Sequence, residues 1–364
     1  MRKKGGGKDI SPIILTVLLM LLASSCGSAA DSSGEDSLGD AGARDSGNND
    51  TDINSDTGGS DDSGQVIETG PVSIAFSVHV ENWPVVTDES YQDLVSLLQT
   101  WADLFEAHEA HLTFEVKEIV AAATQRGDTV LADLEERGHI LGLHIDVGAG
   151  PGAPGNYPQL VEELTSRRIA LEDHGVTVRH ASGICAPELD WIAAAGEAGF
   201  TFTTGLVEYC LKSLPEEEQS ARIRNCANPT HCHGPVPYDL NARMIPWRTN
   251  TASALLDPMP DGQLVILPKV GGIYCMAEGE GPGTPRCTFG DDDIAALAPI
   301  VDAGNVLAQS TDEVVHIHFG FSTVNPPDLD TLDRLLDAVD NHVARGEVRW
   351  STVAEHYDRF VAQE

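Results

Sequence analysis

The sequence predicts an α/β domain with parallel strands, arranged either as a barrel or as a doubly wound sheet. Two observations lead to this fold class. Short apolar segments typical of strands alternate with amphipathic segments typical of helices. The segment from about Val72 to Glu364 is long for one domain, but its length suits an α/β barrel.

The alternation is clearest in the first half of this segment. Val72 to Val80 is a predicted strand, and Thr87 or Asp88 can cap the helix that follows. Apolar residues three, four and seven positions apart form one stripe on that helix: Leu94, Leu97, Leu98, Trp101, Leu104 and Phe105. The next expected elements are a strand over 112–116, a helix over 128–137, a strand over 140–145 and a helix over 158–174.

The second half is less regular. A helix over 189–198 leads into a strand over 200–204, and residues 206–290 then interrupt the rhythm with many Pro, Gly and Cys residues. We expect long Cys-rich insertions around a rim in that stretch. The remaining expected elements are a strand over 314–319, a helix over 328–345 and a strand over 348–350.

The N-terminus has the pattern of an export signal. Basic residues precede an apolar run from Ile13 to Ala23, which is shorter than the ~20 residues that a membrane span needs. The run ends in Ala-Ser-Ser-Cys26, which resembles a bacterial lipobox, although Leu22 lies one place further from the cysteine than usual. We therefore predict a lipoprotein signal peptide over residues 1–26, with a lipid on Cys26 that anchors the chain in the cell envelope, at the outer membrane, in the periplasm or at the cell surface. A plain signal peptide cut near Ala30 is the alternative.

Residues 27–70 are Ser, Gly, Asp and Asn with few apolar side chains, which predicts a disordered linker before a folded domain over 71–364. The whole chain has a formal net charge of −35, and the excess of acids continues into the folded part. Phosphate-rich partners require positive charge, so nucleic acid is excluded as a partner. An anionic membrane surface is a poor partner for the same reason, and we expect membrane contact through the lipid alone.

The cysteines also indicate export. Beyond Cys26 an even number remains, which favours disulfides in an oxidising compartment. Cys275 and Cys287 flank a Gly/Pro-rich loop and are the best local pair. A zinc site at Cys226, His231, Cys232 and His233 is the alternative, although its spacing fits no familiar finger. The cysteines open to pairing are Cys185, Cys210, Cys226, Cys232, Cys275 and Cys287.

Three predicted strands carry pairs of titratable residues two positions apart, near their ends. Residues at this spacing point to the same side of a strand. In parallel α/β folds the chemistry lies beyond the carboxyl ends of the strands. The pairs are His79 with Glu81, His144 with Asp146, and His316 with His318.

These strand ends carry a resemblance to a known family. Residues 134–144, LEERGHILGLH, resemble the RGHEIGLH segment of the polysaccharide deacetylases, the NodB-homology family. HVENW at 79–83 is similar to that family's DVEDW, and LTFEV at 112–116 is similar to its ATFFV. ICAP at 184–187 takes the place of FRAP, and VHIH at 315–318 takes the place of the last LxH strand. The order of the five pieces agrees from Val72 to Tyr357.

The resemblance implies a distorted (β/α) barrel that removes N- or O-acetyl groups from a polysaccharide or peptidoglycan with one divalent metal, commonly zinc. By position, Glu81 and His144 are metal ligands. His318, or alternatively His316, is the general acid. His79 stands where the family has its catalytic aspartate, and an imidazole can also accept a proton.

The chain departs from the family pattern at three places. His79 replaces the base aspartate, Gly148 replaces the second metal histidine, and Cys185 replaces an arginine. Asp146 or His79 can complete a three-ligand set with Glu81 and His144. The departures leave a second interpretation open, in which the fold has lost catalysis and binds carbohydrate or another envelope component.

Two tryptophans are candidates for stacking on sugar rings, as aromatic side chains often do in carbohydrate sites. Trp83 lies at the end of the first predicted strand, and Trp247 lies in the Cys-rich stretch. A core role is the alternative for each of them.

Overall fold

The structure is a computed structural model that describes residues 71–148, 153–227, 232–277 and 287–364. The predicted signal peptide, the lipidated Cys26 and the linker over 27–70 lie outside the described residues. So does His231 of the alternative zinc cluster.

The described elements are strands, α-helices and short 3₁₀ turns. The strands are β1 Val72–Val80, β2 Thr113–Val116, β3 Ile140–His144, β4 His180–Ser182, β5 Phe202–Thr204, β6 Trp247–Thr249, β7 Leu264–Leu267, β8 Gly271–Gly272, β9 His316–Ser322 and β10 Val348–Trp350. The helices are α1 Asp88–Ala107, α2 Glu118–Arg126, α3 Val130–Glu136, α4 Tyr157–Glu172, α5 Trp191–Glu197, α6 Ala221–Arg224, α7 Asp291–Ser310, α8 Leu329–Ala344 and α9 Val353–Gln363. The 3₁₀ turns are η1 Glu208–Ser213, η3 Ala242–Met244, η4 Ala252–Ala254 and η5 Ile273–Cys275.

The strands form one sheet in the order β6-β7-β5-β4-β3-β2-β1-β9-β8, and β10 pairs with the start of β1. Between these strands the pairing of β6 with β7 is antiparallel and the others are parallel. Residues 264–272 link the two sides of the sheet, because β7 pairs with β5 while β8 pairs with β9. The predicted α/β class with a large parallel sheet is confirmed.

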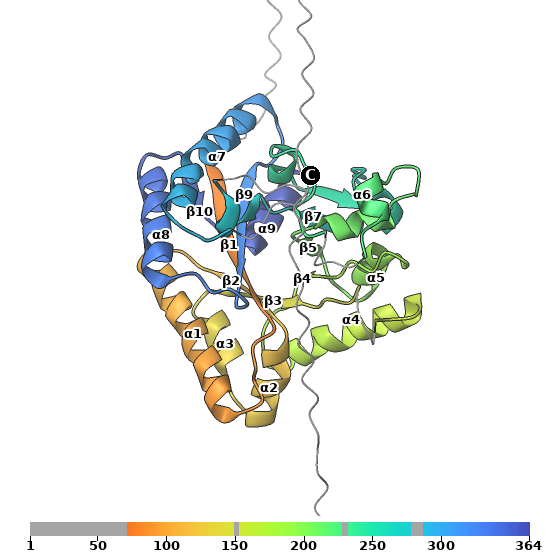
Figure 1. Ribbon diagram of the computed structural model, residues 1–364, viewed down its shortest axis with the longest axis horizontal. Helices are drawn as coiled ribbons and strands as arrows, with labels where there is room; N and C mark the ends of the chain where they lie inside the picture. The colour runs from red at the N-terminus through yellow and green to blue at the C-terminus, as the bar shows by residue number, and fades with distance from the viewer. Residues whose placement is uncertain (1–70, 149–152, 228–231, 278–286) are drawn as a thin grey trace, which may run out of the picture. The chain divides into compact units, whose positions relative to one another are not determined.

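Helices α1 to α5, α7 and α8 lie around the outside of the strands (Figure 1). Thr87 is the N-cap of α1, and its side chain accepts a hydrogen bond from the backbone N–H of Ser90. The predicted stripe holds its central members in the core, where Leu94, Leu98 and Trp101 are buried. Burial of such a stripe is what stabilises an amphipathic helix on a sheet.

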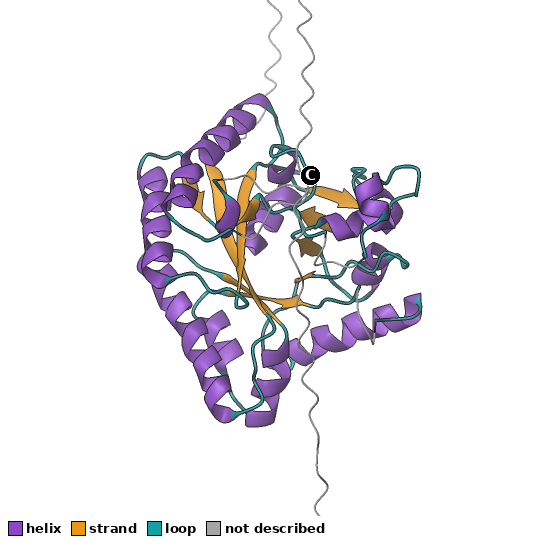
Figure 2. Cartoon of the chain, in the orientation of Figure 1, coloured by secondary structure: helices purple, strands orange, loops and turns teal. Residues whose placement is uncertain are grey.

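The opposite face of the sheet, which we call the inner face, carries polar side chains. Lys269, between β7 and β8, lies with its Nζ 2.7 Å from Nε2 of His79 on β1, so the sheet curves around this face (Figure 2). Glycines make room there. A Cβ on Gly142 would lie 2.1 Å from the His180 ring, and a Cβ on Gly320 would lie 3.2 Å from Lys269.

Helix α9 packs against the inner face near the starts of the strands. Its Val353 and Phe360 form a small apolar cluster with Ala75, Phe202 and Val265. The metal-ligand candidates described below lie towards the carboxyl ends of the strands, so the apolar and polar parts of the inner face are separated along the strand direction.

Several elements were not predicted. The stretch 206–290 is more than an insertion, because it contains β6, β7 and β8, and β7 lies between β5 and β6 in the sheet. Sequence patterns missed β7 and β8 because Pro268 and two glycines interrupt their apolar run. Helix α7 was also missed, since Pro299 lies inside it. β4, α2 and α9 were not expected either.

The described cysteines support the disulfide interpretation. Cys185 is bonded to Cys210, and Cys226 is bonded to Cys232. The second bond contradicts the alternative zinc cluster, because a disulfide sulfur has no thiolate to offer a metal. The expected Cys275–Cys287 bridge depends on the side chain of Cys275, which lies outside the described residues. These bonds fit an oxidising compartment. None of the helices in the described ranges combines the length and the apolar character that crossing a membrane requires.

His108, the C-cap of α1, joins that helix to α8. Its Nδ1 lies 2.6 Å from Oδ2 of Asp340, and its Nε2 lies 3.1 Å from Oδ1 of Asp333. Burial lowers the pKa of His108, but the hydrogen bonds to Asp340 and Asp333 outweigh burial, so the pKa is raised above its ordinary value. The imidazolium therefore holds the two helices together.

A raised pKa means that folding favours the protonated ring, so its stabilisation is complete below the unfolded pKa of about 6.5 and is lost as the pH rises through the folded pKa. We expect His108→Gln to lower the free energy of unfolding by about 1 kcal/mol at pH 6 and by less at pH 9. Urea denaturation at both pH values measures this difference. An equal loss at both pH values would contradict the ion-pair account.

Candidate metal centre

Glu81, His144 and Asp146 converge just beyond β1 and at the end of β3. One ligand atom from each lies within 4.8 Å of the others. Nε2 of His144 is 3.3 Å from Oε2 of Glu81 and 3.1 Å from Oδ1 of Asp146. The structure thus brings together the three residues that the sequence predicted as metal ligands.

The backbone around this cluster is unusual. Asn82 and Asp146 both have a φ of 54°, a left-handed conformation that few residues other than glycine adopt. Gly183 also has a positive φ, and a Cβ there would lie 2.9 Å from the Asp146 nitrogen and 3.0 Å from its Oδ1. The chain accepts backbone strain where it turns these side chains towards one another, a pattern common at functional sites.

A hydrogen-bond chain fixes the orientation of the His144 ring. Ser182 donates its single hydroxyl proton to Oε2 of Glu115, at 2.8 Å. The Ser182 oxygen therefore accepts from Nδ1–H of His144, also at 2.8 Å. In the neutral ring the lone pair then lies on Nε2, which faces Glu81 and Asp146. This is the tautomer that a metal ligand needs.

The two carboxylates of the cluster favour a positive charge between them. Burial lowers the pKa of His144, but the hydrogen bonds and charges of Asp146 and Glu81 outweigh it and raise the pKa to about 9. The imidazolium therefore neutralises part of the two carboxylates. A divalent cation can replace that proton, because both demand positive charge at the same place.

Each carboxylate also has a partner outside the cluster. Oδ2 of Asp146 accepts from Lys117 Nζ at 2.8 Å, and Oε2 of Glu81 also accepts from Asn82 Nδ2 at 3.0 Å. Burial raises the pKa of Asp146, but His144 and Lys117 outweigh it and hold the pKa far below its usual range. The pKa of Glu81 is lowered as well, so both acids are ionised at neutral pH.

His79 lies beside this cluster, stacked on His144 with ring centroids 4.3 Å apart. Its Nε2 is 2.8 Å from Oε2 of Glu115 and 2.7 Å from Nζ of Lys269, while its Nδ1 is 4.0 Å from Oε1 of Glu81. Burial, followed by the charges of Lys269 and His144, lowers the pKa of His79 to about 4. The ring is neutral at pH 7, and its side chain is 20% exposed.

Glu115 and Lys269 are central residues that the sequence analysis missed. Glu115 is fully buried on β2, and besides His79 and Ser182 its partners include the Thr204 hydroxyl, which donates to Oε1. Burial raises the pKa of Glu115, but the charges of Lys269 and His79 hold it well below its usual range. The sequence did offer a signal for Glu115, because it is an acid within an otherwise mostly apolar predicted strand. Lys269 gave no such signal, because its strands were not predicted.

Other groups of ligand-type residues occur in the described ranges. His79, Glu115 and His144 also approach one another within 4.8 Å. Lys269 Nζ, however, lies 3.5 Å from Oε2 of Glu115, so an ammonium already supplies positive charge there. A third group pairs His108 with Asp337 and Asp340 on the outside of the sheet. In the group with Glu81, His144 and Asp146, by contrast, Nε2 of His144 faces the two carboxylates at the ends of the strands.

Gly148 has no space for a side chain. A Cβ there would lie 1.8 Å from the carbonyl oxygen of Cys185, and Tyr209 donates its hydroxyl to the Gly148 carbonyl at 2.8 Å. No histidine can therefore replace this glycine without moving the backbone of the Cys185 loop. The glycine is therefore required by the local packing, and Asp146 is the third ligand candidate in the cluster.

The remaining predicted residues lie away from the cluster. His316 and His318 are fully buried, with His318 Nε2 3.0 Å from Ser77 Oγ and His316 Nε2 3.0 Å from the Pro268 carbonyl. Their assignment as general acid stays a prediction.

The two candidate stacking tryptophans differ in exposure. Trp83 is half-buried, with Nε1 donating to the Ser90 carbonyl, and Trp247 is buried, with Nε1 donating to the Leu255 carbonyl. Trp83 is therefore the better of the two candidates for stacking on a sugar ring.

The sequence was compared with known proteins. No family model matches it, and no curated protein matches it. The solved structures that are similar include a 4-alpha-glucanotransferase from Thermococcus litoralis, with 12% identity and a TM-score of 0.45 over 80% of this chain and 40% of that chain. They also include a probable polysaccharide deacetylase from Pseudomonas aeruginosa PAO1, with 14% identity and a TM-score of 0.48 over 80% of this chain and 92% of that chain. The chain thus spans less than half of the glucanotransferase.

The proton on His144 predicts a pH-dependent metal affinity. Because a metal must displace this proton, the apparent zinc affinity is expected to fall about tenfold for each pH unit below the His144 pKa. Competition with a chromophoric chelator at pH 6, 7 and 8 measures it. His144→Ala is the control that removes the ligand. An affinity that is equal at all three pH values would contradict binding at His144.

Proposed function

We propose that this chain is a metal-dependent hydrolase of the cell envelope that removes acetyl groups, as amides or esters, from a glycan or peptidoglycan. The observation that carries the proposal is the convergence of Glu81, His144 and Asp146 at the strand ends, with the neutral ring of His79 stacked beside them. The acetylated glycan as substrate follows from the resemblance of the strand-end motifs.

The residues fit a divalent cation such as zinc. One imidazole and two carboxylates leave a position open for substrate or water, as catalytic sites of this metal do. When bound, the cation polarises an acyl carbonyl and makes a water molecule more acidic. Glu81, His144 and Asp146 would hold the cation, and the hydrogen bond from His144 Nδ1 to Ser182 would keep Nε2 directed at it.

His79 is proposed as the group that accepts a proton from the attacking water. In the tautomer that this role requires, Nε2–H donates to Glu115, which leaves the lone pair on Nδ1, the atom that faces Glu81. The Lys269 ammonium, 2.7 Å from Nε2, must then donate to Glu115 and not to the ring. A buried carboxylate behind an imidazole fixes its tautomer and stabilises the imidazolium after proton transfer. Lys269 opposes that charge, so the proton is held briefly and can pass on to the leaving group.

Export gives the substrate class its context. The described disulfides fit an oxidising compartment, where glycans of the envelope are found. The predicted lipid on Cys26 would retain the domain near that substrate. The acidic composition argues against nucleic acid as an alternative polymer.

Two observations favour the second candidate, a glycan-binding protein without catalysis. Gly148 closes the place of a second metal histidine, and the predicted general acids His316 and His318 are buried. This alternative predicts glycan affinity that does not change in His144→Ala, with no release of acetate.

The test is acetate release from N- and O-acetylated glycan oligomers by the zinc-loaded full chain. We expect His79→Ala to lower kcat by about 10²- to 10⁴-fold, as loss of a general base does. Glu115→Gln should lower kcat through the tautomer of His79, and the exposed His111→Ala should act as wild type. Failure of metal-loaded protein to release acetate from any of these oligomers, together with glycan binding that persists in His144→Ala, would establish the alternative.

A further inference from the structure

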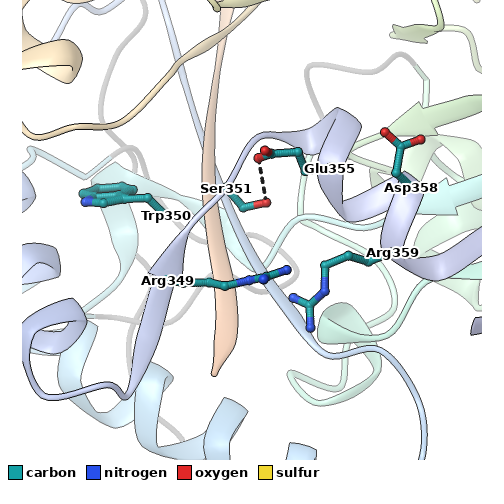
Figure 3. Close-up of a pocket in the computed structure, with 6 residues that line it drawn as sticks. All are labelled: Arg349, Trp350, Ser351, Glu355, Asp358 and Arg359. Carbon is teal, nitrogen blue, oxygen red and sulfur yellow. Dashed lines mark hydrogen bonds between the residues drawn. The ribbon is translucent and has the colours of Figure 1, made fainter. Parts of the chain in front are cut away.

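A separate pocket lies beside the start of β1, on the strand β10 and the helix α9. It has a volume of about 240 Å³, and its lining residues are Arg349, Trp350, Ser351, Glu355, Asp358 and Arg359 (Figure 3). β10 pairs with residues 72–74, whereas Glu81 follows the other end of β1. At about 3.3 Å per residue, the pocket is roughly 25 Å from the metal centre along the strand.

Two arginines of this pocket have no ion-pair partner among the described residues. Figure 3 shows the side chains of Arg349 and Arg359 extending towards one another, and the positive charge of Arg349 acts on Arg359. Within the ranges that the structure describes, neither guanidinium makes an ion pair or a hydrogen bond. Nη1 of Arg359 is also buried without a partner there.

The two acids of the pocket are already engaged elsewhere. Asp358 pairs with Arg179, whose Nη2 lies 2.6 Å from its Oδ1. Glu355 closes the capping box of α9, where it accepts from the Thr352 N–H at 2.7 Å and from the Ser351 hydroxyl at 3.1 Å. Neither acid therefore makes an ion pair with Arg349 or Arg359, although the charge of Glu355 remains at the border of the pocket.

An uncompensated pair of like charges destabilises a fold, and a buried donor without an acceptor adds to that penalty. Burial, followed by the charge of Arg349, lowers the pKa of Arg359. The chain has a net charge of −35, yet no acid of the described ranges forms an ion pair with either guanidinium. The pocket thus keeps a positive site that an external anion can complete.

We propose that this pocket binds a phosphate or phosphoryl group between Arg349 and Arg359. A phosphate offers several oxygens and can accept from two planar guanidiniums at once, whereas one carboxylate is satisfied by one arginine. The bound carboxylates of Glu355 and Asp358 at the border disfavour a long polyanion. The occupant is therefore a single phosphoryl group, either free phosphate or one carried on a small headgroup.

The experiment measures phosphate binding by metal-free full-length protein. Isothermal titration with inorganic phosphate is compared with chloride at equal ionic strength, and a parallel arm uses vesicles with or without phosphatidylglycerol. We expect Arg349→Gln and Arg359→Gln each to weaken phosphate binding by about tenfold or more. Arg345→Gln, which removes a nearby arginine paired with Glu347, is the matched control and should bind as wild type.

The outcomes separate the possible sources of the group. Phosphate binding that the two variants lose and that Glu81→Gln retains supports a pocket independent of the metal centre. Binding only to phosphatidylglycerol vesicles, again lost in the two variants, identifies a headgroup as the source. No binding beyond the chloride control in either arm, or equal binding in all variants, would overturn the proposal.

Discussion

The buried carboxylate of Glu115 is the constraint on which the rest of the inner face depends. It lies on β2 and is bound by Ser182 of β4, Thr204 of β5, His79 of β1 and, at 3.5 Å, by Lys269 between β7 and β8. A buried charge without partners is strongly destabilising, and loss of one partner of such a pair costs about 3–5 kcal/mol. One side chain therefore ties together the strands that bring the candidate ligands to one place.

Glu115 also determines the orientation of the two imidazoles in the candidate metal centre. Because Glu115 takes the hydroxyl proton of Ser182, the ring of His144 must donate through Nδ1 and present Nε2 to the two acids. Glu115 also faces Nε2 of His79, and in the tautomer that donates to Glu115, rather than the one that accepts from Lys269, that ring presents Nδ1 to the same cluster. One buried acid thus orients two imidazoles, and the open ring nitrogens face the side where positive charge is required.

The sequence predicted the α/β class and the residue pairs at the strand ends, because alternation and strand polarity are local properties. It could not predict the network that holds those pairs. Glu115 was visible on a predicted strand, but its partners come from strands far away in sequence. Lys269 stood in a stretch that Pro268 and neighbouring glycines made unlike a strand. Arg349 and Arg359 showed no pattern, since only the packing of α9 beside β10 brings them together.

The central claim is that Glu81, His144 and Asp146 form a metal centre, and metal content tests it most directly. Elemental mass spectrometry of the purified chain, after reconstitution with zinc and removal of loosely bound ions, should find about one zinc per molecule in the wild type. It should find almost none in His144→Ala, with the fold of both proteins checked by circular dichroism. Absence of stoichiometric metal from the folded wild-type chain, or equal metal in both proteins, would contradict the account.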